Sequence, residues 1–91
     1  MSPKLARRDL PDGSFIDIAI DEIKPDRFRP HGVRYRFAWI EKYNCRVLFD
    51  NHPGKTDHCH IDGVEKDYAF ISIEKLYDDF LAEIRNLGGI I

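Results

Sequence analysis

The sequence predicts an α+β protein: an antiparallel sheet of four or five strands with one C-terminal helix packed on one face. Two segments, residues 15–23 and 33–40, alternate apolar with polar residues, which is the period-two pattern of half-buried strands. Residues 73–87 instead repeat apolar side chains at spacings of three and four, as an amphipathic helix does. Because the strands come first and the helix last, we expect the helix to cover the apolar face of the sheet.

Size and composition indicate one small domain that spans residues 1–91. The chain is 43% hydrophobic and 12% aromatic, which gives so short a chain enough apolar area for one core. No apolar run approaches the roughly 18–20 residues that cross a bilayer, and the first residues lack the apolar stretch of a signal peptide. Cys45 and Cys59 form no CxxC pair, so we expect reduced thiols. These features predict a cytoplasmic protein without membrane contact.

The first half of the chain reads as strands separated by turns. Asp12-Gly13 favours a tight turn between one strand and the next, because glycine adopts positive φ values without cost. In the strand that follows, Ile16, Ile18 and Ile20 lie on one face. Residues 24–32 contain two prolines and several basic residues, which predicts a basic surface loop.

The strand at residues 33–40 has an aromatic face and a basic face. Tyr35, Phe37 and Trp39 alternate with Arg34 and Arg36. A turn at 42–44 and a second strand at 45–50 complete a hairpin.

A last short extended segment at 68–71 is expected before the helix. Ser72 can cap the helix through its side-chain oxygen, and Gly88-Gly89 ends it. The apolar stripe between them consists of Ile73, Leu76, Tyr77, Phe80, Leu81, Ile84 and Leu87.

Charge is distributed unevenly, although the net charge is only −2. Residues 1–46 contain ten Lys or Arg and seven Asp or Glu, whereas residues 47–91 contain four and nine. This asymmetry allows a local basic surface for a phosphate or a partner, and two ordinary solvated faces are the alternative interpretation.

The segment from residue 50 to residue 60 concentrates the ionisable side chains of the chain. His58 and His60 are two residues apart, so in an extended backbone both imidazoles point to the same side. Two histidines can bind a divalent metal with Asp50, Asp57 or His52 as a third ligand and an open position for water, so a metal-binding hydrolase is an alternative function. Because no matched metal-site spacing follows, we predict no metal cofactor; if one binds, its ligands are His58, His60 and Asp57.

Metal-free phosphodiester chemistry is the leading interpretation of the same segment. One histidine would act as the base and the other as the acid, while cationic side chains stabilise charge on the phosphate. The catalytic group in this hypothesis comprises His58, His60, Lys55 and Asp50, and the binding group comprises Arg34, Arg36, Asn51 and Asp57.

Other features have simpler interpretations. Gly54-Lys55-Thr56 lacks the first glycine of a phosphate loop and predicts a surface turn. Cys59 is expected to be an unreactive thiol, and His31 is expected to face solvent. A non-enzymatic alternative uses the basic loop from Arg27 to Arg36, together with the histidine-containing turn at residues 50–60, as a docking surface for a protein.

Several motifs taken in order resemble the TumE family of bacterial toxin-antitoxin proteins over nearly the whole chain. They are Asp12-Gly13, His31 to Arg36, Asp50-Asn51, Gly54-Lys55, Asp57-His58-x-His60, Ser72 to Leu76, and Asp79-Phe80. Thr56 and Cys59 depart from the Gly-Lys-Gly-Asp-His-Arg-His sequence frequent in that family, so no phosphate contact through position 59 is carried over.

The resemblance implies a cytoplasmic growth-inhibiting toxin of a two-component module. It implies a cognate antitoxin, often a helix-turn-helix protein, and it carries no established reaction. The leading hypothesis is therefore a toxin that acts on RNA, or on a target bound to nucleic acid, through His58 and His60. An exposed first strand could also pair with its twin to form a homodimer.

Overall fold

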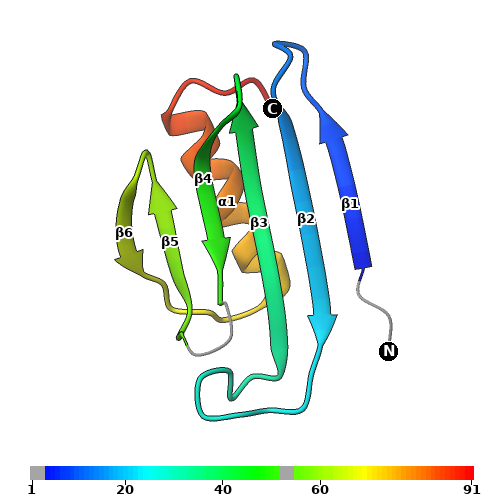
Figure 1. Ribbon diagram of the computed structural model, residues 1–91, viewed down its shortest axis with the longest axis vertical. Helices are drawn as coiled ribbons and strands as arrows, with labels where there is room; N and C mark the ends of the chain where they lie inside the picture. The colour runs from blue at the N-terminus through cyan, green and yellow to red at the C-terminus, as the bar shows by residue number, and fades with distance from the viewer. Residues whose placement is uncertain (1–3, 52–54) are drawn as a thin grey trace.

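In the residues that the structure describes, a six-stranded antiparallel sheet has one helix on one face (Figure 1). The computed structural model describes residues 4–51 and 55–91. Each strand pairs with its neighbours in the chain, so the strand order in the sheet is the order in the sequence. The elements are β1 (Lys4–Asp9), β2 (Phe15–Glu22), β3 (Val33–Glu41), β4 (Asn44–Asp50), β5 (His58–Ile61), β6 (Val64–Asp67) and α1 (Ile73–Asn86).

The predicted α+β class and the C-terminal helix are confirmed, but the predicted number of strands is wrong. The two strands of the β5–β6 hairpin have four residues each, too few for a clear alternating pattern. Asp62 and Gly63 join them with φ values of 47° and 82°, the left-handed pair of a tight hairpin turn. The segment at 68–71, which we expected to be extended, forms no strand and leads from β6 to α1.

Aromatic side chains of the central strands form the core beneath the helix. Phe37 of β3 lies opposite Phe49 of β4, which lies opposite Cys59 of β5, and all three are buried. The rings of Phe37 and Phe80 meet edge to face, with their centroids 5.6 Å apart. Residues directly opposite on paired strands project to the same face, so this row defines the helix side of the sheet.

The helix begins and ends where the sequence indicates. The Ser72 side chain accepts a hydrogen bond from the Lys75 backbone N–H at 3.1 Å, and Gly88 adopts a φ of 90° after the last turn. Leu76, Phe80 and Ile84 of the predicted stripe are fully buried against the sheet. This burial fixes α1 against one face.

The opposite face of the sheet is open within the described residues, because α1 lies behind the strands in Figure 1. No helix in the described part of the chain is long and apolar enough to cross a membrane.

Candidate functional site

A row of ionisable residues crosses the open face of the sheet. Arg36 of β3 lies opposite Asp50 of β4, Asp50 lies opposite His58 of β5, and His58 lies opposite Asp67 of β6. The first three of these residues are each next, along the strand, to a member of the buried row that contains Phe37 and Phe49. The side chains of the ionisable row therefore point away from the helix.

His58 is buried between two oxygen atoms. Its Nδ1 donates a hydrogen bond to the Thr56 carbonyl at 2.9 Å, because a carbonyl can only accept. Its Nε2 lies 2.7 Å from Asp50 Oδ1, and this oxygen is buried without a hydrogen-bond partner in the described residues. The hydrogen bond at Nδ1 fixes the orientation of the ring, and Nε2 is the nitrogen that faces Asp50.

His60 lies beside His58, and the two ring centroids are 5.2 Å apart. Its Nε2 is 3.5 Å from Oε1 of Glu65, which lies opposite it on β6. The same Glu65 oxygen is 4.0 Å from His58 Nε2 and 3.8 Å from Lys55 Nζ. We name the set His58, His60, Glu65 and Asp50 the histidine cluster.

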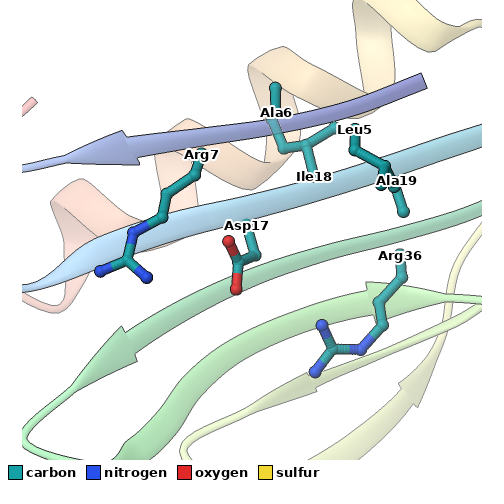
Figure 2. Close-up of a pocket in the computed structure, with 7 residues that line it drawn as sticks. All are labelled: Leu5, Ala6, Arg7, Asp17, Ile18, Ala19 and Arg36. Carbon is teal, nitrogen blue, oxygen red and sulfur yellow. The ribbon is translucent and has the colours of Figure 1, made fainter.

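A shallow groove lies over β1, β2 and β3, as Figure 2 shows. Arg36 and Arg7 stand on either side of Asp17 in this groove. Arg7 is bound to Asp9 at 3.2 Å, whereas Arg36 is exposed and has no ion pair within residues 4–51 and 55–91. The groove is lined by Leu5, Ala6, Arg7, Asp17, Ile18, Ala19 and Arg36.

Arg34 shares the open face with Arg36 but is paired. Its Nη2 donates to Asp21 Oδ2 at 2.6 Å, and the side chain is about half exposed. Of the two arginines on β3, Arg36 is therefore the one that lies next to the histidine cluster.

Asp57 belongs to a separate network at the end of the sheet. Its Oδ1 accepts from Tyr35 Oη at 2.9 Å and from Asn51 Nδ2 at 3.1 Å, and His31 Nε2 lies 3.1 Å from both of its carboxylate oxygens. Val33 N–H donates to His31 Nδ1, so the Nε2 of a neutral ring donates to the carboxylate.

Asn51 extends this network to the backbone of β3. It is fully buried, accepts from the Tyr35 N–H at 3.0 Å and donates to the Val33 carbonyl at 2.7 Å. These bonds continue the pairing of β3 beyond the last residue of β4. Asn51 and Asp57 therefore hold the strand ends, while the other predicted site residues lie on the open face.

The expectation that His31 faces solvent is wrong. Its ring packs on that of Phe70, with centroids 4.1 Å apart, and only 19% of its side chain is exposed.

Tyr35 is affected by the same network. Burial, together with the Asp57 carboxylate, raises the pKa of the Tyr35 phenol far above its usual range.

Glu65 is the site residue that the sequence reasoning missed. Since the β5–β6 hairpin was not expected, nothing in the prediction brought residue 65 to His60. The Asp62-Gly63 pair was the available signal, because a two-residue turn fixes which residues lie opposite one another. Two predicted participants, His52 and Gly54, lie outside the described residues.

Cys59 points to the core and not into the histidine cluster. Its side chain is buried on the helix side between two histidines of the open face. Burial raises the pKa of its thiol, which keeps it protonated and unreactive near neutral pH.

The fold and the histidine cluster define a small α+β protein that presents ionisable side chains on an open sheet face. A family model described as "Toxin TumE" matches residues 4–87, nearly the whole chain. The chain belongs to this toxin family, which confirms the resemblance seen in the sequence. Searches of curated proteins and of solved structures found no match.

Proposed function

We propose that this protein is the toxin of a type II toxin-antitoxin module and that it cleaves RNA in the cytoplasm at the histidine cluster. Membership of the toxin family supports the toxin role. The observation that supports the chemistry is the arrangement of His58 and His60 beside Arg36 on one open face of the sheet.

His58 is suited to be the general acid. The hydrogen bond to the Thr56 carbonyl holds the orientation of its ring, and Nε2 is the nitrogen that would give a proton to the substrate. His60 is 35% exposed and makes no contact with a backbone carbonyl among the described residues, which suits a base that must meet a substrate hydroxyl.

The proposed reaction removes one proton from the attacking hydroxyl and gives one proton to the leaving oxygen of a phosphodiester. His60 takes the proton of a ribose 2′-hydroxyl, and the 2′ oxygen forms a bond to the adjacent phosphorus. The bond from phosphorus to the 5′ oxygen breaks, and His58 gives its proton to that oxygen. The products are a 2′,3′-cyclic phosphate and a 5′-hydroxyl end, and Arg36 and Lys55 stabilise the negative charge on the phosphate.

Growth measurements with matched variants test this proposal. Induction of the wild-type chain should arrest growth and produce RNA fragments with 5′-hydroxyl ends. His58→Ala and His60→Ala should each slow cleavage by about 100-fold or more, because general acid or base catalysis contributes roughly that much. Lys66→Ala is the control, since Lys66 is exposed on the same hairpin but lies opposite Cys59, on the helix side.

Growth arrest of equal strength in wild type and both histidine variants would exclude the proposed chemistry. Arrest that disappears only in Arg36→Ala, with cellular RNA intact, would instead identify a toxin that acts by binding a protein.

Since a toxin-antitoxin module has two components, the proposal includes a protein antitoxin. We propose that this antitoxin is a helix-turn-helix protein. Co-production of the protein encoded beside this gene should restore growth in the same induction experiment.

A homodimer through β1 is also part of the proposal. This strand is at the edge of the described sheet, and all six of its residues are exposed. Sedimentation of the purified chain measures its oligomeric state.

A further inference from the structure

Three residues of the histidine cluster bring possible ligand atoms together. Ligand atoms of His58, His60 and Glu65 all lie within 4.8 Å of one another. We propose that these three residues bind a divalent transition-metal ion such as Zn²⁺. Imidazole and carboxylate groups in this combination suit zinc and neighbouring transition metals.

The spacing of the ligand atoms fits a tetrahedral ion. Zinc bonds to nitrogen and oxygen of about 2.0–2.2 Å place tetrahedral ligand atoms roughly 3.3–3.6 Å apart. The Glu65 oxygen lies 3.5 Å from His60 Nε2 and 4.0 Å from His58 Nε2. The Glu65 side chain is exposed, so its oxygen can move by the few tenths of an ångström that tetrahedral geometry requires.

The orientation of His58 is that of a metal ligand. Histidines that bind metals usually donate their second ring N–H to a carbonyl or a carboxylate, which aims the other nitrogen at the ion. His58 Nδ1 makes this bond to the Thr56 carbonyl at 2.9 Å, and Nε2 therefore points into the cluster.

Asp50 gives an independent indication of a cation. Its side chain is only 9% exposed, and Oδ1 is buried without a hydrogen bond to the described residues, although it lies 2.7 Å from His58 Nε2. A buried carboxylate oxygen without a hydrogen-bond partner favours a positive charge nearby. The Asp50 and Glu65 carboxylates would together balance the charge of a divalent ion held by neutral imidazoles.

Metal binding and the proposed RNA cleavage exclude each other, because the metal and the proton compete for the same nitrogen of His58. A chain with bound metal lacks the free imidazoles that acid and base catalysis needs. We therefore expect Zn²⁺ to inhibit RNA cleavage by the purified protein.

Zinc binding is measured on the purified full chain after removal of metals with a chelator and exhaustive dialysis. Calorimetric titration with Zn²⁺ should show one ion per chain. His60→Ala and Glu65→Gln should each weaken binding by more than about tenfold, the lower limit for loss of even an outer-shell partner. Glu22→Gln removes the same charge at the exposed end of β2 and should leave the affinity unchanged.

Thermal unfolding gives a second measurement. Saturating Zn²⁺ should raise the melting temperature of the wild-type chain but not that of His60→Ala. His60 and Glu65 are partly exposed, so their substitution should leave the fold intact, which circular dichroism checks. Equal zinc affinity in wild type and His60→Ala, or no rise in melting temperature, would overturn the site. Since neither measurement uses growth or RNA, the result is independent of the proposed cleavage.

Discussion

At the scale of single residues, neighbours in the sequence have different roles in the fold. The spacing of His58 and His60 was sufficient to predict that both rings share one side of a strand. It did not indicate that Asp50 and Asn51 point to opposite sides, one to His58 and the other to the β3 backbone. That division depends on where β4 ends, which local sequence patterns define poorly.

Replacement of Asn51 tests its structural role. Asn51→Ala removes the partners of the Tyr35 N–H and the Val33 carbonyl, which are buried at the sheet end. Because each unsatisfied buried group costs about 1–3 kcal/mol, we expect the free energy of unfolding to fall by about 2–4 kcal/mol in urea denaturation. Asn86→Ala changes an exposed asparagine at the end of α1 and should cost less than about 0.5 kcal/mol. Equal losses in the two variants would contradict the assignment.

At the scale of elements, long periodic segments were predictable and short polar ones were not. The stripe of α1 and the alternation of β3 gave the correct element types because burial of one face imposes a period. The aromatic residues near position 70 suggested a strand, but Phe70 instead stacks on Tyr35, with centroids 5.6 Å apart. Aromatic side chains in a connection that crosses the core give the same local signal as those in a strand.

The two glycines after α1 allow a matched test at this scale. Gly88 needs its φ of 90° but has open space around it. A Cβ on Gly89 would instead lie 2.2 Å from Cγ2 of the buried Ile84 and 3.1 Å from the Trp39 ring. We expect Gly89→Ala to lower the free energy of unfolding by about 2–3 kcal/mol, as overpacking does.

Gly88→Ala should cost about 1 kcal/mol, which is the strain of a left-handed residue. Chemical denaturation of both variants measures the difference. A smaller loss for Gly89→Ala than for Gly88→Ala would show that the helix end does not pack closely against Trp39.

At the scale of the whole molecule, the sheet brings the two oppositely charged halves of the sequence together. The charge imbalance suggested a basic face, yet β1–β3 come from the basic half, β5 and β6 come from the acidic half, and β4 spans the boundary at residue 46. Side chains of opposite sign lie directly opposite one another on the open face: Arg7 and Asp17, Asp21 and Arg34, and Arg36 and Asp50. Composition alone did not predict these pairs, because they depend on the strand order and register.

The stability of the whole molecule should depend on alkaline pH through Tyr35. This residue is 3% exposed, and burial raises the pKa of its phenol above the usual value of 10. Below pH 10 the phenol is protonated in both states, so its contribution to stability is complete there. Above pH 10 the unfolded chain releases the proton while the folded chain keeps it. The free energy of unfolding therefore falls by up to about 1.4 kcal/mol per pH unit for this group.

Denaturant titrations between pH 9 and pH 11 measure this loss. Tyr35→Phe removes the phenol and should make the decline above pH 10 shallower, although it also removes one donor to Asp57 and lowers stability at every pH. Tyr43→Phe changes a fully exposed tyrosine in the β3–β4 turn and should leave the slope unchanged. The difference in slope, not in stability at neutral pH, isolates the titration of the buried phenol. If wild type and Tyr35→Phe decline in parallel, the phenol of Tyr35 ionises as readily in the folded chain as in the unfolded one, and its burial beside Asp57 has no effect on the alkaline limit of the fold.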